Sequence, residues 1–220
     1  EKTGRIRAFL GSQLPDGGWR DIDYANNHLV LFEGFRHLQR LEAMALTCAA
    51  PSTPLYGDPA LLDALKRGID LWTRRSPRSK NWWFNQIGSP RSMANILLLA
   101  GDRLSSGMIT GALDTVHESY ETRRQFSTGQ NLVWKSMNDI AYGCLAGDPV
   151  PYRYGIAAIT GVIRGGKGEG IQRDFTFQQH GPQFYSGGYG YAFIADVAQF
   201  AVLVRETSHR LSREKLDLVT

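Results

Sequence analysis

The residue types best suited to proton transfer gather in one glycine-rich segment of the chain. Residues 174–191 read DFTFQQHGPQFYSGGYGY and contain one histidine, His180, and three tyrosines. A histidine and a tyrosine that lie near each other can form a proton-transfer pair. We expect Gly187 and Gly188 to adopt backbone conformations closed to other residues, which places Tyr189 at the start of a helix. A competing interpretation, that the tyrosines cap the core beneath a turn, is slightly favoured by this segment taken alone.

Two further segments carry side chains that could bind or polarise a substrate. Trp82 and Trp83 are adjacent, so they cannot share one face of a helix, and at least one ring is hard to bury. An exposed tryptophan on a loop offers a flat apolar surface to a sugar ring, whereas core packing of both rings is the alternative. Asn131 ends the segment TGQN just before a predicted helix, and a role as N-cap explains it completely. Local sequence favours that structural role.

Several other chemistries have no signature in the chain. The five histidines are scattered without HxxxH or HExxH spacing, so no metal site is predicted. There is no phosphate-binding loop and no GxSxG segment. A glycoside hydrolase would need two suitably placed carboxylates. Asp16, Asp21, Asp23 and Asp174 are available, but nothing in the sequence pairs them.

The elements that must position these residues are predicted to be helices. Apolar residues recur at spacings of three and four through most of the chain, and strand-like alternation is nearly absent, so the fold class is all-α. Asp58 and Pro59 have the residue types of a helix N-cap and first position. The predicted helices cover about 27–49, 58–75, 90–100, 105–120, 131–146, 152–163 and 189–206. We expect them to pack as antiparallel hairpins in a single domain, 1–220, with a functional irregular segment over 164–190.

Composition adds few constraints on function. The chain is 42% apolar and 21% charged, as in ordinary globular proteins, and it lacks the uninterrupted apolar run of about 18 residues that would predict a membrane span. Its net charge of +4 suits an acidic partner, and no nucleic-acid-binding motif accompanies that charge. Cys48 and Cys144 lie outside any CxxC and are expected to be buried free thiols, although one disulfide remains possible. The first residues show no signal-peptide pattern.

Taken together, these segments resemble the family-8 polysaccharide lyases, which include hyaluronate, chondroitin AC and xanthan lyases. The segments that carry the resemblance are NWWFNQIGSP (81–90), TGQN (128–131) and FQQHGPQFYSGGYGYAF (177–193), with DGGWRDIDY (16–24) and PLYGDPALLDAL (54–65) in support. Five motifs in the same order are specific, and they cover nearly the whole chain. The family commonly has glutamate at the position of Gln86 and TGAN in place of TGQN.

The resemblance implies an incomplete (α/α) toroid of antiparallel helical hairpins, the N-terminal part of a lyase catalytic domain. It implies an acidic polysaccharide as substrate, neither metal nor cofactor, and no nucleic-acid or membrane partner. By the same resemblance, Asn81, Trp82 and Trp83 bind the sugars. A secreted or periplasmic location is also implied.

For catalysis, the resemblance implies β-elimination at a uronate. Asn131, helped by His180, neutralises the carboxylate, and deprotonated Tyr189 takes the C5 proton and returns it to the leaving oxygen. In the family, an arginine from a later part of the toroid assists the tyrosine, and β-sandwich domains follow. Arg205, Arg210 and Arg213 lie too close to Tyr189 in sequence to match it. The chain is therefore expected to be a truncated or naturally short form.

Two other functions remain open at this point. The chain could be a glycan-binding remnant that uses the tryptophans and its basic surface without catalysing elimination. It could also be a different α/α-toroid enzyme, a glycoside hydrolase with two catalytic carboxylates.

Overall fold

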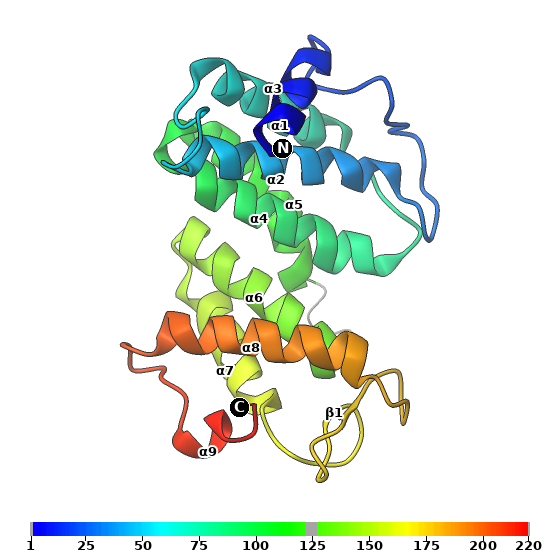
Figure 1. Cartoon of the computed structure of the whole chain (residues 1–220), viewed down its shortest axis with the longest axis vertical. Coiled ribbons are helices and arrows are strands. Elements are labelled where there is room, and N and C mark those ends of the chain that lie inside the picture. Colours follow the sequence, from blue (N-terminus) through cyan, green and yellow to red (C-terminus); the bar gives the residue numbers. More distant parts are fainter. Residues whose placement is uncertain (1, 122–126, 220) are drawn as a thin grey trace. The chain divides into compact units, whose positions relative to one another are not determined.

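A computed structural model describes residues 2–121 and 127–219, and it confirms that the fold is all-α (Figure 1). The chain divides into two compact units, residues 1–119 and 120–220. The prediction of a single domain remains a prediction. The helices and strands, in chain order, are α1 (Lys2–Ser12), α2 (Glu33–Ala49), α3 (Pro59–Arg75), η1 (Phe84–Gly88), α4 (Ser89–Ala100), η2 (Gly101–Arg103), α5 (Ser106–Glu121), α6 (Gly129–Ala146), α7 (Pro149–Val162), β1 (Gly170–Ile171), β2 (Phe177–Gln178), η3 (Ser186–Gly190), α8 (Tyr191–Val204) and α9 (Arg213–Leu216).

The helix starts of the first unit show where local signals suffice. Helix α3 begins as predicted, with the Asp58 carboxylate accepting the backbone N–H of Leu61 at 2.9 Å. Helix α2 begins only at Glu33, later than predicted. The residues before it form a turn-rich segment tied to a distant loop, since the carbonyl of His28 accepts a hydrogen bond from the Ser79 hydroxyl at 3.0 Å. Helix α1 was not predicted.

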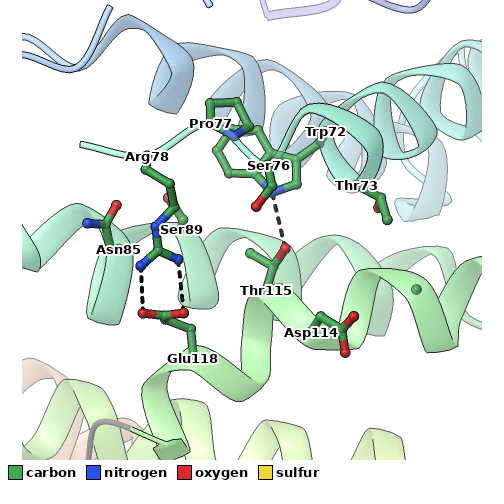
Figure 2. Close-up of a pocket in the computed structure, with 11 residues that line it drawn as sticks. Trp72, Thr73, Ser76, Pro77, Arg78, Asn85, Ser89, Asp114, Thr115 and Glu118 are labelled. Atoms are coloured by element: carbon green, nitrogen blue, oxygen red, sulfur yellow. Dashed lines mark hydrogen bonds and ion pairs between the residues drawn. The ribbon is translucent and has the colours of Figure 1, made fainter. Parts of the chain in front are cut away.

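The core of the first unit forms where α2 packs against α3 and α4. A cavity of about 360 Å³ lies beside this core and is lined by residues of α3, α5 and the segment between them (Figure 2). Figure 2 shows the indole N–H of Trp72 donating to Thr115 at 3.1 Å and Arg78 donating twice to Glu118, at 2.8 and 2.9 Å. The first bond joins α5 to α3, and the other two join α5 to the segment that follows α3.

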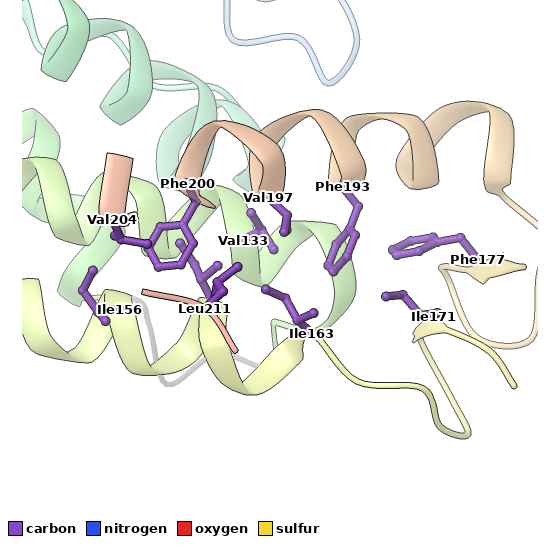
Figure 3. Close-up of a cluster of buried hydrophobic side chains, with 11 residues drawn as sticks. Val133, Ile156, Ile163, Ile171, Phe177, Phe193, Val197, Phe200, Val204 and Leu211 are labelled. Carbon is purple, nitrogen blue, oxygen red and sulfur yellow. The ribbon is translucent and has the colours of Figure 1, made fainter. Parts of the chain in front are cut away.

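The second unit is built on the hairpin of α6 and α7, which pack closely together. A Cβ atom at Gly155 would lie 2.5 Å from the carbonyl oxygen of Ser136, so only glycine permits this approach. Helix α8 lies against α6 and contributes Phe193, Val197 and Phe200 to a buried apolar cluster (Figure 3). Their positions at intervals of three and four residues form one stripe along α8.

The segment predicted to be irregular, 164–190, contains some regular structure. Strands β1 and β2 pair antiparallel, with Ile171 opposite Phe177, and both side chains are buried in the same cluster (Figure 3). The π-helical turn η3 then leads into α8. Two-residue strands are too short to produce a detectable alternation in sequence. The segment is thus anchored to the core at its centre.

Helix α8 also bears on the question of a membrane span. Within the described part of the chain, one helical stretch, Ser186–Val204, is long and apolar enough to cross a membrane, although no uninterrupted apolar run predicted it. The core helix of a soluble protein meets the same criterion. Phe193 and Val197 are 0% exposed, so this helix buries one face in protein.

Both cysteines are free thiols, which leaves no disulfide between them. Cys48 is buried on α2, as expected, but Cys144 is exposed near the end of α6. The expectation of burial was wrong for Cys144 because helical periodicity does not identify which face of α6 meets the core.

Candidate active site

The structure brings His180 and Tyr189 into direct contact. The His180 Nε2 atom lies 3.1 Å from the Tyr189 hydroxyl oxygen, and the two rings are perpendicular, with centroids 5.0 Å apart. His180 follows strand β2, and Tyr189 lies in η3 just before α8. The chain reverses between them, so two side chains nine residues apart meet at one hydrogen bond. A pair at this distance can exchange a proton.

Aromatic rings surround the phenol of Tyr189. Its ring lies edge-on to Tyr185 at 5.1 Å and tilted against Trp134 of α6 at 5.7 Å. Tyr189 is half-buried against the core cluster, while Tyr191 is 73% exposed. Capping of the core by all three tyrosines is therefore wrong. Tyr189 alone both covers the core and presents its hydroxyl to a histidine.

Gly187 and Gly188 do not adopt the backbone conformations that were predicted for them. The backbone angles φ of Gly187 and Gly188 are not positive, whereas those of His180 and Gly181 are +58° and +80°. A Cβ atom at Gly188 would lie 2.8 Å from the Tyr185 ring. Glycine is needed here because there is no room for a side chain, and not because the backbone conformation is unusual. The left-handed conformation is found at the histidine itself.

The surroundings of Tyr189 raise its pKa above the ordinary value of 10. Burial is the largest cause, followed by the negative charges of ionised Tyr185 and of Glu169. All three favour the protonated phenol. In this arrangement the tyrosine keeps its proton at neutral pH. For Tyr189 to act as a base, a cation or hydrogen-bond donor must approach its hydroxyl.

Asn131 does not cap α6, so that prediction was wrong. The helix starts at Gly129, with Thr128 in the N-cap position and Asn131 in the first turn. The N–H of Gln130 is instead capped by the side-chain oxygen of Gln179, 2.9 Å away and 49 residues along the chain. The long-range amide takes the role that local sequence assigned to Asn131.

The Asn131 side chain is therefore not used to start the helix. It is only 7% exposed, and among the described residues no donor reaches its buried Oδ1 atom. Asn131 lies three residues before Trp134, on the same face of α6. Because Trp134 contacts Tyr189, that face of α6 is directed toward the histidine–tyrosine pair. No hydrogen bond joins Asn131 to either member of the pair within the described part of the chain.

The tryptophan segment belongs to the first unit, whereas Asn131, His180 and Tyr189 belong to the second. Trp82 is 44% exposed, whereas Trp83 packs against Phe35 and Phe84. Both lie in a helical turn that continues into η1, and not on a loop as predicted. A π-helical turn at this point is notable because such turns are frequent at functional sites. Trp82 is the more exposed of the two rings.

Asn81 has a structural role in the first unit. Its Oδ1 atom accepts the backbone N–H of Trp83 at 3.0 Å, and its Nδ2 atom donates to the carbonyl of Leu29 at 2.9 Å. These bonds fix the turn that carries the tryptophans. Sugar binding by Asn81 stays a prediction, and its amide would need to use its remaining hydrogen-bonding capacity.

The carboxylates considered for hydrolysis are engaged in local structure. Asp21 pairs with Arg40, whose hydrogen bond is the main cause that lowers the Asp21 pKa. Asp16 and Asp23 accept backbone N–H groups two residues ahead, as does Asp174. Asp174 belongs to the second unit, and the other three belong to the first. The geometry gives no support to a pair of catalytic carboxylates.

Comparison with known proteins identifies the relationship. The family described as polysaccharide lyase family 8, N terminal alpha-helical domain, matches residues 16–220. The chain belongs to this family. The resemblance found in the sequence is thus confirmed, and the family match spans both units.

Family-8 relatives include enzymes with different named substrates. The chain is 28% identical over 212 residues to chondroitinase-AC of Pedobacter heparinus, covering 94% of this chain and 30% of that protein. It is 26% identical over 215 residues to xanthan lyase of Bacillus sp. strain GL1, covering 88% and 23%. It is 26% identical over 198 residues to hyaluronate lyase HylB of Enterococcus faecalis, covering 78% and 20%. The chain spans less than a third of these relatives.

Solved structures of the family agree with the fold. A chondroitinase AC lyase studied in complexes with oligosaccharides superposes with a TM-score of 0.90 at 25% identity, covering 99% of this chain and 32% of that one. The chondroitin AC lyase of Streptomyces coelicolor gives a TM-score of 0.86 at 24% identity, covering 99% and 31%. The predicted lyase-toroid fold class is supported by these matches.

Sequence reasoning missed several residues of the candidate site. Trp134 contacts Tyr189, Gln179 accepts the N–H of Gln130 next to Asn131, and Glu169 accepts the N–H of Gly181 next to His180, yet none of the three was selected as a site residue. A signal that could have pointed to Gln179 is the glycine of TGQN, Gly129, from which no inference was drawn. Its φ is +52°, and a Cβ there would lie 2.3 Å from the Gln179 side-chain oxygen.

Proposed function

We propose that this chain carries the proton-transfer residues of a polysaccharide lyase that cleaves uronate-containing acidic glycans by β-elimination. The observation that carries the proposal is the 3.1 Å contact between His180 Nε2 and the Tyr189 hydroxyl. Family membership and the names of the relatives support a substrate of the chondroitin, hyaluronan or xanthan type. The net charge of +4 favours an acidic polymer.

In the proposed reaction, Tyr189 removes the proton from C5 of the uronate. The electrons of the C–H bond pass into the carboxylate system, which the Asn131 amide and His180 stabilise by hydrogen bonds. They then form the C4–C5 double bond as the C4–O bond breaks. The leaving oxygen takes the proton back from Tyr189, which returns to its starting state. No oxidant, metal or cofactor enters this balance.

The raised pKa of Tyr189 sets a requirement for this mechanism. The phenol must lose its proton before it can accept one, and its surroundings disfavour that loss. Part of the requirement can be met by His180, whose Nε2 atom can take the phenol proton across this contact and then donate a hydrogen bond to the phenolate. The rest must come from the bound substrate or from a cation brought to the site. If no cation or donor reaches the Tyr189 hydroxyl, the phenol keeps its proton and cannot act as a base. The chain would then bind glycan without catalysing elimination, which is the second candidate function.

Sugar binding is proposed for the tryptophan segment of the first unit. The 44% exposure of Trp82 supports stacking of a sugar ring on that indole. Trp83 contributes by supporting the turn. A polymeric substrate also suggests a secreted or periplasmic location.

The test is the ultraviolet absorbance of the unsaturated uronate during incubation with chondroitin sulfate, hyaluronan and lyase-pretreated xanthan. Replacing Tyr189 by phenylalanine keeps the ring contacts and removes the hydroxyl. We expect the rate to fall by at least about 100-fold, the usual contribution of a positioned acid–base group. Tyr191→Phe is the matched control, since Tyr191 is 73% exposed two residues further on. Glycan binding without any absorbance change would instead support the second candidate function.

A further inference from the structure

We propose that Glu169 is a positioning residue that holds His180 against Tyr189 and fixes the start of α6 beside them. The proposal rests on the proposed function, because it gives Glu169 a part in the same reaction. Glu169 lies immediately before strand β1, inside the segment 164–190 that was predicted to be irregular and functional, but it was not itself selected as a site residue.

Both oxygens of the Glu169 carboxylate are used. Oε1 accepts the backbone N–H of Gly181 at 2.9 Å, and Oε2 accepts hydrogen bonds from the Thr128 hydroxyl and the Gln179 side-chain amide. Gln179 and Gly181 are the two neighbours of His180 in the chain. One carboxylate therefore holds both neighbours of the histidine, Gly181 by its backbone N–H and Gln179 by its side-chain amide.

The same contacts extend to the start of α6. Gln179 is 1% exposed, and while its Nε2 atom donates to Glu169, its Oε1 atom accepts the N–H of Gln130. Thr128 is the N-cap residue of α6, and its hydroxyl is bound to Glu169 instead of capping the helix. Asn131 lies three residues after Thr128. The carboxylate thus joins the segment that carries Asn131 to the segment that carries His180.

The backbone at His180 shows why such support is needed. With φ at +58°, this residue is in a left-handed conformation that costs a non-glycine residue about 1 kcal/mol or more. His180 is itself exposed, so burial of its ring does not hold it in place. Hydrogen bonds to its two neighbours are the contacts that can stabilise this conformation. They set the direction of the imidazole toward Tyr189.

The hydrogen bonds of Glu169 support the site, whereas its negative charge opposes ionisation of Tyr189. Its negative charge is one of the causes that raise the pKa of Tyr189, which opposes formation of the phenolate. A residue that stabilised the phenolate of Tyr189 by its charge would have to be positively charged. The geometry therefore assigns Glu169 the role of holding the segments together.

The experiment compares Glu169→Ala, Glu169→Gln and Glu169→Asp with the wild type in the complete encoded protein. Asp174→Asn is the matched control, because Asp174 is a carboxylate of the same loop whose hydrogen bonds, in the part of the chain that the structure describes, stay within its own turn, to Thr176. We measure kcat and KM, and the imidazole resonances of His180 in protein with labelled histidine. His180 is assigned by the signal that is lost in His180→Gln.

We expect kcat to fall about 100-fold in Glu169→Ala with KM nearly unchanged, since misplacement by about 1 Å can have that effect. Glu169→Gln can still accept from Gly181 but presents an N–H₂ to the Gln179 amide, so it should lose less activity. Glu169→Asp should recover part of it. The His180 resonances should move in Glu169→Ala and stay in place in Asp174→Asn.

Several results would overturn the proposal. They are wild-type kcat in Glu169→Ala, a rise in KM alone, or unchanged His180 resonances in all Glu169 variants. If Glu169→Ala does not fold, Glu169→Gln and Glu169→Asp give the same tests. If the wild type yields no unsaturated product, the proposed function fails, and the His180 resonances alone decide whether Glu169 positions the histidine.

Discussion

Replacing Gly129 by alanine tests whether Gln179 fixes the amino end of α6. Gly129 has φ at +52°, and an added Cβ would lie 2.3 Å from the side-chain oxygen of Gln179. Atoms cannot approach that closely, so the Gln179 amide must move away. The N–H of Gln130, which Gln179 accepts at 2.9 Å, would then lose its partner inside the protein.

The expected magnitude has two parts. Holding alanine in a left-handed conformation costs about 1 kcal/mol. Leaving a buried N–H without an acceptor costs about 2 kcal/mol. Gly129→Ala should therefore lower the free energy of unfolding by about 3 kcal/mol. Gly147, at the other end of α6, has φ at +68° with no atom within 4 Å of an added Cβ. Gly147→Ala should lose only the first part, about 1 kcal/mol.

Urea unfolding of the wild type and both variants measures these quantities, and the difference between the variants isolates the displacement of Gln179. A third variant, Gln179→Ala, removes the acceptor without backbone strain and should lose about 2 kcal/mol. If Gly129→Ala were no less stable than Gly147→Ala, Gln179 would not hold the helix start. The reasoning about long-range capping would then be refuted.

Two other predictions concern stability. His37 is fully buried, and burial lowers its pKa from 6.5 to about 4, so its stabilising effect is complete above pH 6.5 and is lost as the pH falls toward 4. The free energy of unfolding should fall by about 3 kcal/mol in total, at 1.36 kcal/mol per pH unit. Urea unfolding at pH 7.5 and 4.5 should show a smaller fall between the two pH values for His37→Gln than for the wild type. Equal falls in the two proteins would contradict this. Lys215 donates to the carbonyls of Thr160 and Ile163, at 2.7 and 2.9 Å, at the end of α7. Lys215→Met should therefore lower the unfolding free energy by about 1–2 kcal/mol, whereas the exposed control Lys167→Met should change it little.

Local sequence was sufficient for the helices whose signals lie within them. Helix α3 has its own N-cap in Asp58, its first-position proline and an apolar stripe, and it begins where predicted. The start of α2 was misplaced because the preceding segment is held by Ser79, from a distant loop. The strands β1 and β2 were missed because each has only two residues. Local periodicity predicts elements that are stabilised by local contacts.

By itself, the sequence determined the class of fold, the family, and the residue types able to move a proton. His180 and Tyr189 are close in the chain, so a short turn could bring them together and sequence could suggest the pair. Only the tertiary structure decided that Gln179 caps α6, that Asn131 is not a cap, and that Glu169 joins their segments. Those contacts cross up to 49 residues of chain. They form only once the core has brought the segments together, and no local pattern encodes such an arrangement.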